Sequence, residues 1–155
     1  MNKYVIIFCL ALSFELCSDY MMPSDNQIFN NDKNSVIDAS VIKIGPTGNI
    51  HLKTHTLIHG KNRPTQLVNT SLSCTGGSPS LFGVKANKRY IIITQGNNMY
   101  EESSYFEVFK KNGQLKFDYQ FYNMGTISGN KELSIKQLKS YIMKSKKAKK
   151  YSHEK

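Results

Sequence analysis

The stretch Val36–Ile58, VIDASVIKIGPTGNIHLKTHTLI, decides the fold expected for this chain. Val36–Ile44 is predicted to be a strand, with Val36, Asp38, Ser40, Ile42 and Ile44 on one side and the residues between them on the other. Apolar and polar residues alternate most clearly in Ile50–Ile58, which is the period of a half-buried β-strand. Between the two runs lies Gly45–Asn49, whose glycines and proline are typical of a turn. The stretch therefore predicts two neighbouring antiparallel strands joined as a hairpin.

Further strand signals follow downstream, and a helical signal closes the chain. The strand signals lie at Gln66–Ser73, at Arg89–Thr94, and at Tyr105–Phe109 with Leu115–Tyr122. The second is a nearly continuous apolar run, typical of a strand buried on both faces, and Asn112-Gly113 is a strong hairpin signal. From the potential N-cap Ser134, the apolar residues form a helical stripe, made by Ile135, Leu138, Tyr141 and Ile142. We therefore expect a mainly β protein: a small antiparallel, OB-like barrel over residues 36–132, then one C-terminal helix.

The first eighteen residues have the order of a secretory signal peptide. Lys3 supplies a positive start, Tyr4–Leu12 an apolar run, and Ser13–Ser18 a more polar end with a small final residue. The run is shorter than the roughly twenty apolar residues that span a membrane. We therefore expect residues 1–18 to direct export and residues 19–35 to form an extended leader that could include one turn of helix. We expect the protein to be secreted or periplasmic, with no permanent membrane span.

The position of signal cleavage decides which cysteine chemistry is available. Cleavage after Ser18 leaves Cys74 as the only cysteine of the mature chain. Cleavage after Ser13 fits the small-residue rule better but leaves a very short signal. It would retain Cys17, and a possible disulfide between Cys17 and Cys74 could then form in an oxidising compartment. In both cases the fold must rest on its apolar core.

The positive charge of the chain is concentrated at its C-terminus. The formal net charge is +10, and residues 133–155, with eight lysines and one glutamate, carry +7 of it. We interpret this segment as a helix that frays into a Lys-rich tail, of a kind that is usually solvated. The tail could contact an anionic surface such as membrane phosphate or lipopolysaccharide, through Lys144, Lys146, Lys147, Lys149 and Lys150. Because the chain is expected to be exported, no nucleic-acid partner is expected.

Candidate catalytic and metal-binding residues do not combine into a site. His51, His55 and His59 lie four residues apart, which in a strand separates them by about 13 Å. Zinc holds its nitrogen ligands at about 2.1 Å, so two of these histidines cannot share one ion within the strand. Asp38 faces the same side as apolar residues of its strand, and a buried carboxylate needs a partner. We expect no catalytic residue, no cofactor and no metal site.

The order of these segments resembles the netrin-module group, which includes the tissue inhibitors of metalloproteinases. The resemblance covers residues 36–95 and is carried by Val36–Ile44, by the strand ending His59-Gly60-Lys61, by the loop cysteine Cys74, and by Val84–Ile93. It implies a five-stranded OB-type barrel with a flanking helix. Inhibitors of that group place a Cys-x-Cys N-terminus against the protease zinc, whereas Cys17-Ser18-Asp19 lacks the second cysteine. A link from Cys17 to Cys74 would resemble the group's link between N-terminus and barrel loop.

Three functions are compatible with these observations. The first is an exported, non-enzymatic binding or interaction module with a protein partner or an anionic surface as its target. The alternative is a secreted protease inhibitor of the tissue-inhibitor-of-metalloproteinase-like type, which rests on the resemblance. A hydrolase comes third, because neither a catalytic triad nor a carboxylate pair can be assigned.

Overall fold

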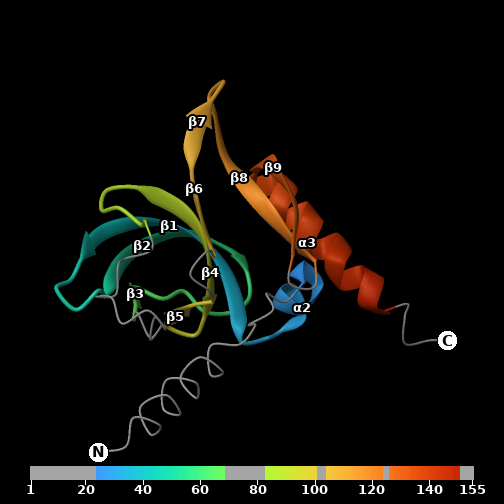
Figure 1. The fold of residues 1–155 in the computed structure, drawn as a ribbon, viewed down its shortest axis with the longest axis horizontal. Coiled ribbons are helices and arrows are strands. Elements are labelled where there is room, and N and C mark those ends of the chain that lie inside the picture. The colour runs from blue at the N-terminus through green and yellow to red at the C-terminus, as the bar shows by residue number, and fades with distance from the viewer. Residues whose placement is uncertain (1–23, 69–82, 101–103, 124–125, 151–155) are drawn as a thin grey trace, which may run out of the picture.

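The computed structural model describes residues 24–68, 83–100, 104–123 and 126–150 (Figure 1). It confirms a mainly β fold, in which an antiparallel barrel-like sheet is followed by a C-terminal helix. The elements are α2 (Asp25–Asn30), β1 (Asn34–Ile44), β2 (Ile50–His59), β3 (Gln66–Leu67), β4 (Arg89–Gln95), β5 (Asn98–Met99), β6 (Tyr105–Glu107), β7 (Phe109–Lys111), β8 (Gln114–Asn123), β9 (Thr126–Ser134) and α3 (Ile135–Lys150). The expected signal peptide, Cys17 and Cys74 lie outside the described residues.

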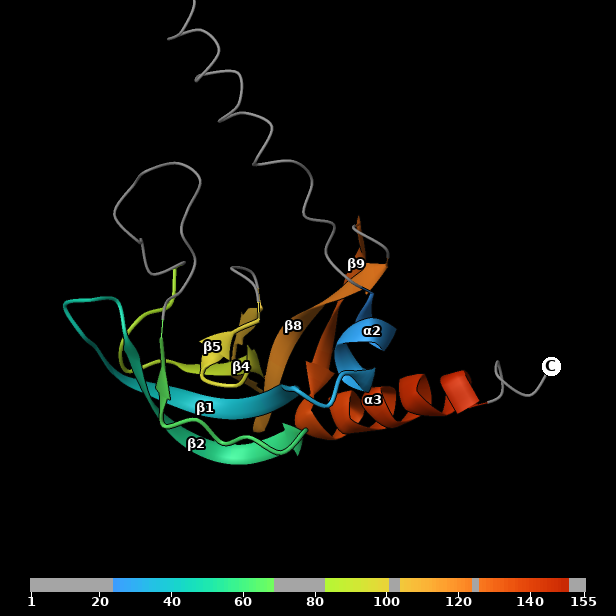
Figure 2. The ribbon, with the colours of Figure 1, turned by 90° about the horizontal axis from the view of Figure 1, so that it is seen from below.

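The barrel-like sheet is built around the predicted hairpin of β1 and β2. Its strand order is β3-β2-β1-β4-β5, and β6 also pairs with β4, opposite Tyr90–Ile92. The two ends of this order meet where Val68 bridges Asn98 and the Val68 amide donates to the Asn97 carbonyl at 2.8 Å. The sheet therefore curls almost onto itself, and Figure 2 shows the curvature of β1 and β2.

Irregular pairing bends the β1–β2 hairpin. The register skips Ile58 and His55 in β2 and Ile42 in β1, and such bulges redirect side chains and increase the twist. Strict alternation predicts Leu57 on the same face as the histidines, but Leu57 packs with the apolar residues inside the sheet. Ile42, predicted to share a face with Val36, is 55 % exposed. The predicted hairpin is confirmed. The predicted faces are wrong for Leu57, which lies between the two bulges of β2, and for Ile44, which follows the bulge of β1, because one extra residue reverses the alternation.

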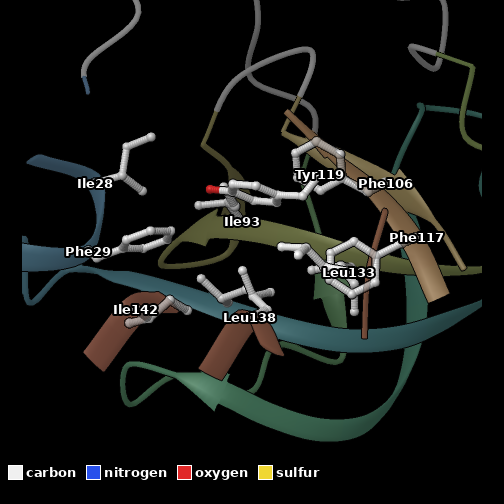
Figure 3. Packing of buried hydrophobic residues seen from close by; sticks show 11 residues of the cluster. Ile28, Phe29, Ile93, Phe106, Phe117, Tyr119, Leu133, Leu138 and Ile142 are labelled. Carbon is white, nitrogen blue, oxygen red and sulfur yellow. The ribbon is translucent and has the colours of Figure 1, made fainter. Parts of the chain in front are cut away.

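The strand β4 separates two clusters of buried side chains. Tyr90, Ile91, Ile92 and Ile93 are each at most 1 % exposed, which confirms the strand predicted to be buried on both faces. Tyr90 and Ile92 face the inside of the barrel-like sheet, with Ile37, Ala39, Val41, Ile50, Leu52, Leu67 and Val84. Ile91 and Ile93 belong to a second set, the outer cluster, with Ile28, Phe29, Val36, Phe106, Phe117, Tyr119, Leu133, Leu138 and Ile142 (Figure 3). The outer cluster joins the barrel-like sheet to both helices and to a second sheet.

The second sheet has the order β7-β8-β9. The predicted Asn112-Gly113 turn joins β7 to β8, with positive φ values of 50° and 76° that suit a tight hairpin turn. The sequence does not predict β9, because TISGNKELS is largely polar; its pairing with the aromatic strand β8 places it in the sheet. The strand expected at Gln66–Ser73 is present as β3 at Gln66–Leu67, and residues 69–73 lie outside the described part of the chain.

The segment expected to be an extended leader, residues 19–35, contains α2 and the start of β1. The helix begins with a capping box: the Gln27 amide donates to Ser24 Oγ at 3.4 Å, and the Ser24 amide donates to Gln27 Oε1 at 2.9 Å. Ile28 and Phe29, each 1 % exposed, lie in the outer cluster. Burying each such side chain stabilises the fold by about 1.5–3 kcal/mol, so residues 24–35 are part of the folded domain.

The helix α3 begins after Ser134, as the sequence predicts. The Ser134 amide donates to Gln137 Oε1 at 2.8 Å, and the Gln137 amide donates to Ser134 Oγ at 3.3 Å. The predicted apolar stripe packs on the outer cluster, with two buried members, Leu138 and Ile142, and two partly buried ones, Ile135 and Tyr141. Where we expected fraying, the helix continues to Lys150, and its last turns extend beyond the sheets (Figure 2).

The buried carboxylate of Asp38 has the partner that its position requires. Arg89 of β4 binds it in bidentate fashion, with Nε at 2.7 Å from Oδ1 and a terminal nitrogen at 2.6 Å from Oδ2. Asp38 is fully buried and the Arg89 side chain is 29 % exposed. The ion pair therefore connects β1 to β4, and without Arg89 the buried Asp38 carboxylate would be an unpaired charge that destabilises the fold.

Replacing Arg89 with methionine is expected to lower the free energy of unfolding by about 3–5 kcal/mol, because Asp38 would keep a buried, uncompensated charge. The matched control is the double variant Asp38→Val/Arg89→Met, in which no charge remains. Urea unfolding should show the double variant to be more stable than Arg89→Met alone. Equal or lower stability of the double variant would contradict this account of the pair.

Candidate functional site: a lysine-lined groove

A buried carboxylate, Asp25, connects α2, β8 and α3. It is 4 % exposed in the first turn of α2, where a negative charge suits the positive end of the helix. Its Oδ1 accepts a hydrogen bond from the Tyr119 hydroxyl of β8 at 2.9 Å, and its Oδ2 accepts one from the Tyr141 hydroxyl of α3 at 2.7 Å. Hydrogen bonds to a charged group contribute about 1.5–3 kcal/mol each. Asp25 therefore holds α3 in one position beside β8.

Aromatic rings surround the Tyr141 end of this arrangement. Tyr141 makes edge contacts with Phe29, Tyr119 and Phe121, at ring-centroid distances of 6.1, 6.1 and 5.1 Å. Burial raises the pKa of Tyr141 well above its usual value, and the hydrogen bond to Asp25 raises it further. The cause is that an ionised phenolate would lose its hydration and face the Asp25 carboxylate. Tyr141 therefore remains a neutral hydrogen-bond donor across the physiological pH range.

A groove of about 370 Å³ lies beside Tyr141, between α3 and the β8–β9 hairpin. Small-molecule sites in proteins have volumes of roughly 300–1,000 Å³, so this groove has the size of a small-ligand site. It combines three apolar or aromatic side chains, Phe121, Leu133 and Tyr141, with three lysines, Lys131, Lys136 and Lys144. We call it the lysine groove. Gln137 and Ser140 of α3 add neutral polar groups to its lining.

Helical spacing and strand pairing bring the three lysines together. Lys136, Ser140 and Lys144 follow one another at four-residue intervals, which places them on one face of α3. Lys131 of β9 pairs with Tyr119 of β8, and directly paired residues share one face of a sheet. Leu133, two residues after Lys131, lies on the same face and is only 6 % exposed. Lys131 is therefore a charged residue on the apolar face that the hairpin turns toward α3.

The groove lysines have no acidic partner among the residues that the structure describes. The nearby carboxylate of Glu132 is occupied by Lys111 at 2.6 Å and by Lys116 at 3.8 Å. Because successive residues of a strand point to opposite faces, Glu132 lies on the face of β9 that is turned away from the groove. The lysine groove is thus an apolar surface bordered by three lysines that form no ion pair with the described carboxylates.

The predicted tail lysines do not all have the same surroundings. Lys144 lines the lysine groove, and Lys146 lies near His59, whose pKa it helps to lower; burial is the larger cause of that lowering. The remaining three, Lys147, Lys149 and Lys150, lie in the last turn of α3. The sequence prediction missed Lys131 and Lys136 as site residues. Helical spacing from Lys144 could have identified Lys136, but no local signal marks Lys131, because β9 itself was not predicted.

The three histidines do not form a metal site. His59 packs edge-on against Phe29 at a centroid distance of 6.1 Å, whereas His55 Nε2 lies 2.7 Å from Ser40 Oγ. Across the described ranges, no group of three His, Cys, Asp or Glu side chains could hold a metal ion. The possible Cys17–Cys74 disulfide falls on residues outside those ranges.

Comparison of the chain with protein-family models, with curated proteins and with solved structures found no match. No helix in the described part of the chain is both long and apolar enough to cross a membrane.

Because the pKa of Tyr141 is raised in the folded protein, part of the free energy of unfolding is expected to be lost at alkaline pH. The unfolded chain releases the Tyr141 proton near pH 10, whereas the folded protein keeps it to higher pH, so folding loses stability as the pH rises above about 10. Tyr141→Phe removes this dependence along with one hydrogen bond, worth about 1.5–3 kcal/mol below pH 10. Urea unfolding between pH 8 and 11 should show the difference between the native protein and the variant shrinking above pH 10. A constant difference would contradict the prediction.

Proposed function

We propose that the protein is an exported, non-enzymatic binding module that attaches to an anionic surface through α3. The observation that carries this proposal is the composition of the helix: IKQLKSYIMKSKKAKK contains seven lysines and no acidic residue. A lysine near an anionic membrane surface contributes about 1 kcal/mol to binding. Several such contributions together would hold a protein at the surface without a deep pocket.

The geometry of α3 supports a surface contact. Leu138 and Ile142 face the outer cluster, so the opposite side of the helix faces away from the domain. Lys139, which is exposed, and Met143, which is 58 % exposed, lie on the flank of the helix next to Ile142 and away from the groove beside Tyr141. We call this flank the outward side of α3. An apolar side chain among lysines is typical of helices that lie in the head-group region of a membrane. Lys147 and Lys150 follow Met143 and Lys139 at helical spacing.

The non-enzymatic part of the proposal is supported by the roles of the buried carboxylates. Asp25 accepts hydrogen bonds from Tyr119 and Tyr141, and Asp38 is paired with Arg89. Both carboxylates are therefore engaged in holding elements of the fold together. The protease-inhibitor alternative stays a prediction, since Cys17-Ser18-Asp19, on which it rests, lies outside the described residues.

The triple variant Lys139→Gln/Lys147→Gln/Lys150→Gln tests the proposed surface contact. It is expected to weaken binding to phosphatidylglycerol-containing vesicles by about 3 kcal/mol, roughly a hundredfold, because three lysines leave the surface. The measurement is co-sedimentation with these vesicles and with phosphatidylcholine vesicles at two salt concentrations. The native protein should bind the phosphatidylglycerol-containing vesicles and should not bind the phosphatidylcholine vesicles. Its binding should be weaker at the higher salt concentration, because salt screens the attraction between charges.

The matched control is Lys33→Gln/Lys53→Gln/Lys110→Gln, which removes three exposed lysines that lie outside α3 and changes the net charge equally. It should retain most of the vesicle binding. If both triple variants lose binding equally, net charge rather than α3 is responsible. If the native protein does not bind anionic vesicles, the proposed surface attachment is wrong.

Export is tested by the intact mass of the protein recovered outside the cytoplasm after expression of the whole chain. We expect a mature protein that begins at Asp19 and contains Cys74 as its only cysteine. A chain that begins at Phe14 would instead retain Cys17, and the mass difference before and after reduction and alkylation would reveal a disulfide. Recovery of the full-length mass in the cytoplasm alone would exclude export.

A further inference from the structure

We propose that the lysine groove binds a single-chain anionic amphiphile, meaning an apolar chain that ends in a carboxylate or a phosphate monoester. This goes beyond attachment of the outward side of α3 to a surface, because it assigns a defined ligand site to a different side of the helix. The site uses Lys131 of β9, which the surface proposal does not involve.

The apolar part of the groove favours a hydrocarbon chain. Leu133 is nearly buried, and Phe121 and Tyr141 are only partly buried. An apolar chain that covered these side chains would remove apolar surface from water on both partners, which is favourable at about 25 cal/mol per Å². The rings cannot turn away from the groove freely, because Tyr141 is held by Asp25 and packs against Phe121. The apolar wall is therefore present before a ligand binds.

The charged part of the groove favours an anion. Lys131, Lys136 and Lys144 carry three positive charges around one groove, and none of them forms an ion pair with a carboxylate in the described part of the chain. Several cationic side chains around one groove raise the local concentration of anions there. Lysine ammonium groups bind carboxylates and phosphates through charge-assisted hydrogen bonds.

The size of the groove limits the ligand to one chain and one head group. Lys136 and Lys144 are eight residues apart, which is about 12 Å along a helix axis, and Ser140 lies between them. A volume of about 370 Å³ is near the lower end of the range for small-molecule sites.

Isothermal titration calorimetry tests the proposal with four probes, each kept below its critical micelle concentration where it has one. Dodecyl phosphate and laurate carry the proposed chemistry and distinguish a phosphate head from a carboxylate head. Dodecyl maltoside has the same chain length with a neutral head, and inorganic phosphate has the head without a chain. We expect 1:1 binding of one or both anionic amphiphiles, and at least tenfold weaker binding of the other two probes.

Single substitutions then locate the site. Lys131→Gln and Lys144→Gln should each weaken binding of the anionic amphiphile at least fivefold, whereas the control Lys139→Gln, on the outward side of the same helix, should change it less than twofold. Ser140→Phe fills the groove while leaving every lysine in place, and should also weaken binding. Because all four side chains are exposed, the variants are expected to fold, and far-ultraviolet circular dichroism checks this.

Four results would overturn the proposal. They are the absence of binding by both anionic amphiphiles, equal binding of dodecyl maltoside, equal binding of inorganic phosphate, and equal losses in Lys131→Gln and Lys139→Gln. The groove proposal and the surface proposal can be tested independently. The Lys131→Gln variant should still bind anionic vesicles, and the triple variant Lys139→Gln/Lys147→Gln/Lys150→Gln should still bind the amphiphile. Loss of vesicle binding alone would therefore leave the groove proposal intact, and loss of amphiphile binding alone would leave the surface proposal intact.

Discussion

The position of α3, and with it the lysine groove, depends on the buried carboxylate of Asp25. A buried charge is tolerated only when its oxygens are hydrogen-bonded, and here the partners come from β8 and α3, about a hundred residues further along the chain. Because both tyrosine hydroxyls must reach one carboxylate, the helix cannot slide along the hairpin without breaking a charge-assisted hydrogen bond. The groove is the space that remains beside this fixed contact, and its shape is therefore set by the fold.

The second constraint is the strand β4, which has no polar face. Its side chains fill the inside of the barrel-like sheet and the outer cluster in alternation, so neither face can be left to water. The inside is closed by β1, β2 and β3, and the outside by α2, α3 and the β8–β9 hairpin. This arrangement explains why the short helix α2 is part of the domain: without Ile28 and Phe29, part of the outer cluster would lose its cover.

Local patterns predicted much of the fold because each depends on neighbouring residues. The turn at Gly45–Asn49, the apolar run of β4, the Asn112-Gly113 turn and the Ser134 N-cap are all read within a few positions, and the structure confirms each of them. The faces of β2 were predicted correctly at Ile50 and Leu52 but wrongly at Leu57, because the bulges at His55 and Ile58 depend on how β2 pairs with β1. The candidate site was predicted only at Lys144. Lys131 could not be found, since its importance comes from pairing with Tyr119 in a strand whose own residues give little β signal.

By itself, the sequence determined the β-rich class, the main hairpin, the doubly buried strand, the C-terminal helix and the concentration of lysines near the end of the chain. These properties follow from periodicity and composition, which act over short distances. Only the tertiary structure decided that Asp25 joins three elements, that Asp38 is paired with Arg89, and that lysines from β9 and α3 surround one apolar groove. The physical reason is that hydrogen bonds, ion pairs and burial act between residues that are close in space, and here those residues are far apart in the chain.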